Sequence, residues 1–302
     1  MSADLNVISH LVLDDKEFLD VKPVKREKSV LGGPPAYATM VTPLLSLKTK
    51  IITSVGKDFP EAYLHYLSSI NRLELEILIG EESTKFLHKI YKDKRTMFLL
   101  AQADSLDEFV EEQKGGKACL ISPVFREISN LSIKWANNNH EYIGLDVQGL
   151  VRNTDRNRKI VLEFDNKYVK SILEDVDIVK FSLKEAEAFT LKKSYSDIFK
   201  SLPINVTNVI TSGLQGVVFN EGEKIYSLKS PTRDELDPTG AGDVLMTGIL
   251  AEIIKNKDVD FCIAFGMALA AEKVQYSKIR TLSSKNYSKV AEEILNTKEL
   301  IK

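Results

Sequence analysis

Short apolar runs alternate with segments of helical periodicity along most of this 302-residue chain. Polar residues or glycines bound each apolar run, and several runs are too uniformly apolar for a strand with one face in water. The pattern therefore predicts buried strands at residues 5–13, 50–55, 118–121, 142–146, 177–180 and 206–211.

The segments between these runs have apolar positions spaced for helices. They predict helices at 36–47, 60–70, 125–138, 165–174 and 183–191, then a hairpin at 217–220 and 224–228 and three further helices at 241–255, 259–276 and 283–296. Alternating strands and helices imply right-handed βαβ crossovers. We therefore expect the α/β class, with a doubly wound, mainly parallel sheet covered by helices on both faces.

Two segments interrupt this alternation. Residues 21–31 are charged and have no helical period, and residues 84–101 have the pattern of a hairpin, with an imperfect period of two in its first arm. A small sheet that projects from an α/β body can act as a lid over a site. We predict a single domain, 1–302, with lid elements at about 12–31 and 84–101; a surface hairpin without a function is the alternative.

Composition narrows the class of protein. The formal net charge is −2, with Lys and Arg scattered among Asp and Glu, so no basic nucleic-acid footprint is expected. The chain lacks a membrane-length apolar run and a signal-peptide pattern at its start. Cys119 and Cys262 lie in separate apolar runs, which predicts buried thiols and a cytoplasmic protein. The four histidines lack the spacing of a zinc site.

The chemistry is concentrated in Asp237-Pro238-Thr239-Gly240-Ala241-Gly242-Asp243, which leads into a predicted helix. The amides of Gly240, Ala241 and Gly242 are expected to be unpaired at the positive end of the helix dipole, where anions bind. Asp243 would add a carboxylate beside that anion, which suits phosphoryl transfer to a hydroxyl whose proton Asp243 accepts. The alternative is a glycine-rich turn with an acidic residue that merely favours the helix start.

This segment closely resembles the C-terminal signature of the ribokinase-like, or PfkB, carbohydrate kinase family. The resemblance implies a ribokinase-like fold, Asp243 as catalytic base and an anion hole formed by Gly240, Ala241 and Gly242. It also implies ATP as phosphoryl donor and Mg²⁺ as the accompanying ion.

Weaker matches follow in the family's order. Gly32 and Gly33 precede a predicted helix and resemble the N-terminal signature that contacts the acceptor, although Tyr37 stands where many members have Asn. Asp14 is at the position of an Asp that binds substrate hydroxyls in relatives, and a carboxylate suits vicinal diols. A tight turn and an acidic residue that opens a loop are the alternatives.

Two matches concern the donor. Ser182-Leu183-Lys184-Glu185 aligns with the family's Asn-x-x-Glu motif, so Glu185 would order Mg²⁺ through water, and Lys180 just before it is assigned to the nucleotide site. The same four residues are also a capping box that starts a helix. Thr211, Gly213 and Gly216 resemble the loop on the phosphate side of the nucleotide, although an ordinary connection between strands would look similar.

The stretch Asp146-Val147-Gln148-Gly149-Leu150-Val151-Arg152 resembles archaeal and plant members that act on inositol-like substrates, which suggests Gln148 and Arg152 as acceptor contacts. A surface arginine in a salt bridge is the alternative. We expect an ATP-dependent kinase of a sugar or cyclic polyol, with a nucleoside second. A ligand-binding or regulatory protein on the kinase fold remains the other class, and use of the lid as a homodimer interface is left open.

Overall fold

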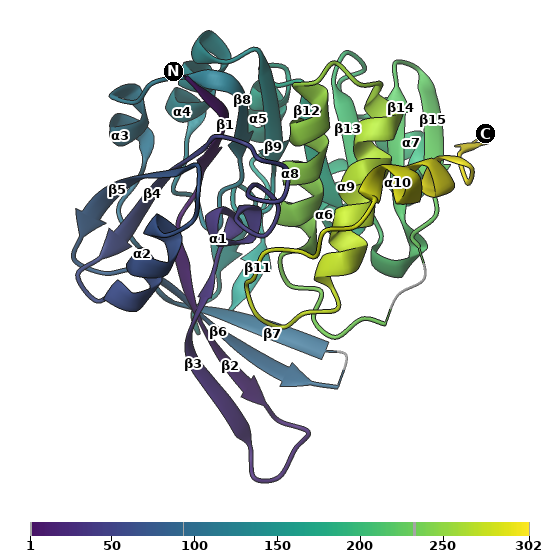
Figure 1. Ribbon diagram of the computed structural model, residues 1–302. Coiled ribbons are helices and arrows are strands. Elements are labelled where there is room, and N and C mark those ends of the chain that lie inside the picture. The colour runs from purple at the N-terminus through teal and green to yellow at the C-terminus, as the bar shows by residue number, and fades with distance from the viewer. Residues whose placement is uncertain (1, 93, 232–233, 302) are drawn as a thin grey trace.

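The computed structural model describes residues 2–92, 94–231 and 234–301. Its centre is one ten-stranded sheet in the order β16-β15-β14-β13-β12-β9-β8-β1-β4-β5 (Figure 1). The strands are β1 (Ala3–Ile8), β4 (Thr49–Gly56), β5 (Leu73–Gly80), β8 (Gly116–Ile121), β9 (Tyr142–Asp146), β12 (Ile178–Ser182), β13 (Thr207–Thr211), β14 (Val217–Glu221), β15 (Lys224–Leu228) and β16 (Glu299–Ile301).

The seven strands from β5 to β13 run parallel, and β14, β15 and β16 extend the sheet in antiparallel fashion. The predicted α/β class with a mainly parallel sheet is therefore confirmed. β1 lies between β4 and β8, so the chain winds outward from β1 in both directions. In such sheets ligands bind beyond the carboxyl ends of the strands where the winding reverses, which here is the region after Ile8 and Ile121.

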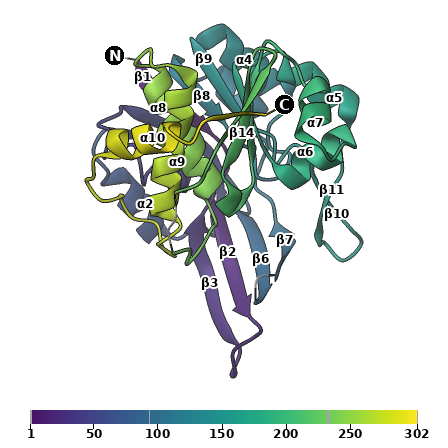
Figure 2. The same cartoon turned by 90° about the vertical axis from the view of Figure 1, so that its right-hand side faces the viewer.

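Helices cover both faces of the sheet (Figures 1 and 2). The first face carries α1 (Pro34–Ala38), α2 (Glu61–Ser68), α8 (Ala241–Ile253), α9 (Val259–Lys273) and α10 (Tyr287–Leu295). The second carries α3 (Asp107–Glu111), α4 (Asn130–Asn139), α5 (Asn166–Leu173), α6 (Leu183–Thr190) and α7 (Tyr195–Lys200). A short 3₁₀ helix, η1, spans Gly213–Gln215. No helix in the described part of the chain is long and apolar enough to span a bilayer.

A second, four-stranded sheet projects from the body on the side of the carboxyl ends of the parallel strands (Figure 1). This small sheet has the order β3-β2-β6-β7 and consists of β2 (Val12–Phe18), β3 (Lys25–Gly32), β6 (Thr84–Tyr91) and β7 (Lys94–Ala101). A hairpin of β10 (Arg152–Thr154) and β11 (Ile160–Leu162) lies beside it. The amide of Leu99 in β7 donates to the carbonyl of Arg158 over 2.9 Å and ties this hairpin to the small sheet.

The strand predicted at residues 5–13 is wrong as a single element, because β1 ends at Ile8 and β2 begins at Val12 in the other sheet. His10 lies at this change of direction and is fully buried. Its Nδ1 lies 2.7 Å from Thr84 Oγ1 and its Nε2 lies 2.8 Å from the carbonyl of Asp104. These contacts hold the chain where it leaves the large sheet.

Two predicted helices are too long. The helix expected at 36–47 covers only Pro34–Ala38, and Pro43, which cannot donate a backbone hydrogen bond, lies in the turns that follow. The helix expected at 125–138 begins at Asn130, where the Ser129 side chain caps it. Before it, Glu127 accepts hydrogen bonds from the amides of Val124 and Phe125 and holds them in a non-helical loop.

Candidate active site

The turn before α8 lies at the carboxyl side of the large sheet and has the local form that the sequence predicts. Gly240 caps α8 with a φ of 80°, a left-handed conformation that favours glycine. A Cβ at this position would also lie 2.3 Å from the ring of Tyr37. Two features therefore require glycine at position 240: the left-handed backbone conformation and the close approach of the Tyr37 ring.

The expectation of three free amides fails at Ala241, because its N–H donates to the carbonyl of Pro238 over 3.1 Å. This bond closes the turn. The amides of Gly240 and Gly242 have no such backbone partner in the described part of the chain. Two donors at the start of a 13-residue helix therefore remain for an anion, together with the helix dipole.

Asp243 lies in the first turn of α8 and is 7% exposed. Its Oδ1 accepts a hydrogen bond of 3.2 Å from the hydroxyl of Ser122, which follows β8. Burial, and after it the charge of Asp146, raises the pKa of Asp243 to about 7, while Lys180, the Ser122 hydrogen bond and Arg152 act in the opposite direction. A carboxyl group with this pKa can exchange a proton near neutral pH, as a general base must.

Lys180 in β12 lies next to the turn. Its Nζ donates to Asp146 Oδ2 over 2.7 Å, and a Cβ on Gly242 would lie 3.0 Å from that Nζ. Burial alone would lower the pKa of Lys180, but the charges of Asp146 and Glu185 outweigh it and raise the pKa. The side chain is therefore a fixed cation beside the Gly242 amide.

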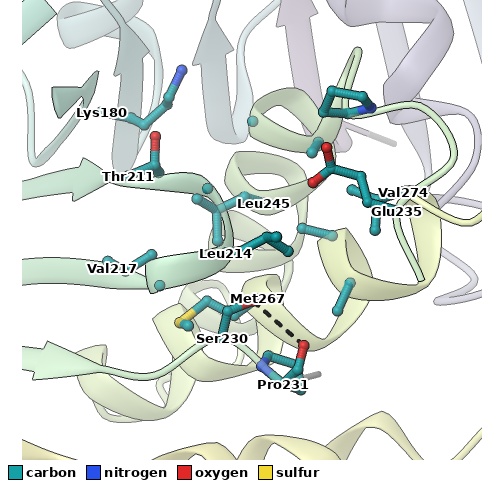
Figure 3. Close-up of a pocket in the computed structure, with 17 residues that line it drawn as sticks. Lys180, Thr211, Leu214, Val217, Ser230, Pro231, Glu235, Leu245, Met267 and Val274 are labelled. Carbon is teal, nitrogen blue, oxygen red and sulfur yellow. Dashed lines mark hydrogen bonds between the residues drawn. The ribbon is translucent and has the colours of Figure 1, made fainter. Parts of the chain in front are cut away.

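Two cavities meet at this cation, since both are lined by Lys180, Pro238 and Gly242. The first, here called the apolar cavity, measures about 240 Å³ and is shown in Figure 3. Its walls come from the η1 loop, the segment before the turn, α8 and α9, and include Leu214, Val217, Leu245, Met267, Ala270, Ala271 and Val274. Thr211, Gly213, Gly216 and Ala241 also line it, so the sequence-predicted nucleotide residues lie together.

The second, here called the polar cavity, measures about 570 Å³ and lies between the large and small sheets. Asp243 and Asp14 both line it. Besides these charged groups, its lining includes the apolar side chains of Val12, Phe86, Met97, Ile160 and Leu162. The turn, Asp243 and a carboxylate of the small sheet therefore line one cavity.

Asp14 in β2 is 5% exposed and makes contacts that the sequence did not indicate. Its Oδ1 lies 2.8 Å from Nε2 of His88 in β6, and Nδ1 of His88 lies 2.8 Å from Nε of Arg95 in β7. Arg95 Nη1 also donates to Thr239 Oγ1 over 2.8 Å. These contacts join the small sheet to the turn.

A second group of contacts surrounds Asp237, the first residue of the signature. Lys16 of β2 forms an ion pair of 3.0 Å with its carboxylate, and Lys273 of α9 donates to its backbone carbonyl over 2.8 Å. The Lys273 ammonium also lies 5.3 Å from the centre of the Tyr37 ring. Burial, and then the charges of Asp14, Asp237 and Asp243, raises the pKa of the Tyr37 phenol well above its ordinary value, so the phenol is neutral.

Glu185 lines the polar cavity, and its Oε2 accepts from the amide of Ser182 over 2.7 Å. Ser182 and Glu185 form the capping box of α6. The described residues contain no cluster of three or more His, Cys, Asp or Glu side chains around a metal position. Mg²⁺ usually keeps several waters and binds through one or two carboxylates and the substrate phosphates, so a single carboxylate at the cavity wall fits it.

Of the other predicted acceptor residues, Gln148, Arg152 and Gly33 line the polar cavity and Gly32 does not. Arg152 and Gln148 line it, and Arg152 Nη2 donates to Gln148 Oε1 over 2.8 Å. Gly33 lines it with a φ of 88°, whereas Gly32 lies beneath Asp14, where a Cβ would lie 2.6 Å from Oδ2.

Sequence reasoning missed Ser122, Asp146, His88, Arg95 and Lys273. Ser122 and Asp146 could have been found, because each stands at the carboxyl end of a predicted parallel strand. The other three depend on contacts between distant segments and carried no local signal.

The fold is similar to that of solved kinase structures. It resembles the sulfate complex of a pyrophosphate-dependent kinase of the ribokinase family, with a TM-score of 0.78, 22% identity and coverage of 97% of this chain and 99% of the other. The nucleoside kinase of Methanocaldococcus jannaschii superposes with a TM-score of 0.73 and 20% identity, covering 98% and 99% of the two chains. The architecture is that of the ribokinase-like kinases, as predicted.

A model of the pfkB family carbohydrate kinases matches residues 4–286. The chain belongs to this family of kinases. A cytidine kinase from Thermococcus kodakarensis is 25% identical over 289 residues, which cover 89% of this chain and 95% of that protein. An ATP-dependent 6-phosphofructokinase from Thermoanaerobacterium thermosaccharolyticum is 25% identical over 262 residues, covering 82% and 80%. Similar proteins thus include kinases named for nucleosides and for sugar phosphates.

Proposed function

We propose that this chain transfers the γ-phosphoryl group of MgATP to a hydroxyl of a sugar or cyclic polyol. The observation that carries the proposal is that Gly242, with its free amide, lines two cavities of different character, while Asp243 and Gly240 line the polar cavity beside it. One cavity suits a flat, apolar nucleobase, and the other suits a molecule with several hydroxyls. Phosphoryl transfer needs the two reactants to meet at such a boundary.

Each residue at the turn has a separate role in the proposed transfer. Asp243 receives the proton of the acceptor hydroxyl, whose oxygen forms the new bond to phosphorus while the bond from phosphorus to the bridging oxygen of the donor breaks. The amides of Gly240 and Gly242 and the Lys180 ammonium stabilise negative charge on the phosphoryl oxygens. Glu185 would hold Mg²⁺ through water, and the ion would neutralise charge on the donor phosphates.

The acceptor is held from the other side. Asp14 in the small sheet offers a carboxylate to vicinal hydroxyls, and Gln148 and Arg152 face the same cavity. We propose that the small sheet acts as a lid over this cavity and excludes water, which would otherwise compete for the phosphoryl group. The contacts of Lys16 and Arg95 with the turn support that role, because they hold the small sheet against the body.

Two features favour a nucleoside as the second candidate acceptor. The apolar side chains of Phe86, Met97 and Ile160 would contact a base better than a polyol ring. In addition, relatives with 25% identity are named cytidine kinase and nucleoside kinase. A sugar or cyclic polyol ranks first because charged and hydrogen-bonding side chains of both sheets converge on the cavity.

The test measures release of the donor product, ADP from MgATP or phosphate from magnesium pyrophosphate, across a panel of polyols, sugars and nucleosides. Pyrophosphate is included because a structural neighbour is named pyrophosphate-dependent. We expect turnover with ATP and at least one polyhydroxylated acceptor, and loss of it in Asp243→Asn. Melting shifts with the panel but no turnover would favour a binding protein. Turnover with pyrophosphate alone would refute the nucleotide assignment of the apolar cavity.

A further inference from the structure

The small sheet contains a chain of polar contacts that ends at the acceptor carboxylate. It runs from Thr239 in the turn to Arg95, from Arg95 to His88, and from His88 to Asp14. Each of its three links measures 2.8 Å. His88 is 1% exposed and Asp14 is 5% exposed, so water does not substitute freely for the link between these two side chains.

The direction of these hydrogen bonds determines which ring nitrogen of His88 carries the proton. A guanidinium can only donate, so the bond from Arg95 Nε requires a lone pair on His88 Nδ1. A neutral imidazole with a lone pair on Nδ1 carries its proton on Nε2. That nitrogen lies 2.8 Å from Asp14 Oδ1 and donates to it. A second guanidinium nitrogen, Nη2, lies at 3.4 Å from Nε2 and forms no bond with a nitrogen that is already protonated.

We propose that His88 is a positioning residue for the acceptor and that Arg95 sets its tautomer. The ring N–H holds Asp14 Oδ1, so the carboxylate has a fixed rotamer and its other oxygen, Oδ2, remains for the acceptor hydroxyls. This inference rests on the proposed function, because it takes Asp14 as the acceptor ligand.

The surroundings of the ring support a neutral donor. Burial, as the largest cause, lowers the pKa of His88, and the positive charges of Arg95 and Lys16 add to this effect against the raising effect of Asp14. Gly32 contributes from the neighbouring strand, because a side chain there would meet Asp14 Oδ2 at 2.6 Å. Asp14 is thus held through one oxygen, and the missing side chain at Gly32 leaves the room that its other oxygen occupies.

Kinetics of substituted proteins test the role of His88. We expect His88→Phe, which keeps an aromatic ring of similar size, to raise the KM for the acceptor roughly 10-fold to 100-fold while the KM for ATP changes little. His88→Gln should recover most of the loss, because its amide can accept from Arg95 and donate to Asp14. His65→Phe is the matched control, since His65 is exposed on α2. An unchanged acceptor KM in His88→Phe would overturn the proposal.

Arg95→Met tests the tautomer in a protein whose core is untouched, because Arg95 is exposed. Nitrogen-15 spectra of the imidazole rings distinguish a protonated nitrogen from one with a lone pair, and the sequence has only four histidines. In the unsubstituted protein we expect the proton of His88 on Nε2; in Arg95→Met we expect a mixture of tautomers and a higher acceptor KM. A proton on Nδ1 in the unsubstituted protein would overturn the proposal.

The two experiments separate this inference from the proposed function. The nitrogen-15 measurement needs no substrate, so it supports or refutes the tautomer even if the panel contains no acceptor. If the panel shows turnover and His88→Phe leaves the acceptor KM unchanged, the positioning role fails while the kinase assignment stands.

Discussion

Ser122 donates a hydrogen bond of 3.2 Å to Oδ1 of Asp243, although 121 residues separate them in the chain. The bond joins the carboxyl end of β8 to the first turn of α8, at the point where the winding of the large sheet reverses. It favours the ionised form of Asp243, whereas burial disfavours that form. Ser122 therefore adjusts the proton affinity of the proposed base without bringing a charge into the site.

The reaction rate should depend on the ionisation of Asp243. Because Asp243 must be ionised to accept a proton and its pKa is about 7, kcat should rise with pH and level off above an inflection near that value. Initial rates at saturating substrates from about pH 5.5 to 9 measure the profile. A rate that is constant over this range would contradict the assignment of Asp243 as the base.

Ser122→Ala should move this inflection to higher pH. Loss of the hydrogen bond removes a group that stabilises the carboxylate, so the pKa of Asp243 should rise, by about half a unit to one unit. The same pH series measures the shift. Ser171→Ala, in which an exposed hydroxyl of α5 is removed, is the control and should leave the profile unchanged. A shift to lower pH would show that the hydroxyl does not stabilise the anion.

Asp243→Asn should lower kcat roughly 10²-fold or more and at the same time stabilise the protein. The folded-state pKa of about 7 lies above the ordinary value of 3.8, so ionisation of Asp243 destabilises the fold as pH rises between these values, by at most about 4 kcal/mol. The stability advantage of the variant should therefore grow from about pH 4 to 7 and remain constant above. Denaturant titrations at several pH values measure it, and a constant difference would contradict the raised pKa.

Lys273→Met removes the ammonium group that donates to the turn. Burial, as the largest cause, lowers the pKa of Lys273 to about 8, so the unfolded state binds more protons than the folded state between about pH 8 and 10.5. The unsubstituted protein should gain stability over that range and the variant should not. We also expect a lower kcat, because the carbonyl of Asp237 loses its donor. Parallel stability curves for the two proteins above pH 8 would contradict the lowered pKa.

Ala270→Phe should fill part of the apolar cavity. We expect the KM for ATP to rise by about 10-fold, equivalent to about 1.4 kcal/mol, while the KM for the acceptor is unaffected, because Ala270 does not line the polar cavity. Leu131→Phe on the opposite face of the sheet is the control for added bulk. An equal effect on both substrates would mean that the apolar cavity is not specific to the donor.

The features that depend on local sequence pattern were predicted well. Buried parallel strands are uniformly apolar, and all six predicted buried strands coincide with strands of the large sheet, although the first extends too far. The turn before α8 was predictable because glycine and proline restrict the backbone in recognisable ways. The strand β5 was missed because the prediction of strands in the large sheet rests on uniformly apolar runs, whereas in this edge strand Glu74 and Glu76 alternate with apolar residues and both contact Lys50 of the neighbouring strand.

The parts of the site that could not be predicted depend on contacts across the fold. Lys16 and Lys273 look like ordinary lysines in the sequence, but both are buried against Asp237. The pairing of the Ala241 amide with Pro238 is a matter of turn geometry that the residue types leave open. Asp14 was selected by resemblance, yet the histidine that holds it comes from β6, 74 residues further on.

Because the Tyr37 ring packs against Gly240, a substitution in the acceptor site at position 37 also affects the packing of the phosphate-binding turn. The ring at one position fills the space that a side chain would need at the other, and Tyr37 also faces the polar cavity. If a homologue has a smaller residue in place of the tyrosine, for example to bind a different acceptor, the space of the ring beside the turn is left empty. Another side chain must then fill that space. The φ of 80° keeps glycine at position 240 whatever residue stands at position 37, so the compensating change should occur at a third position whose side chain reaches this space.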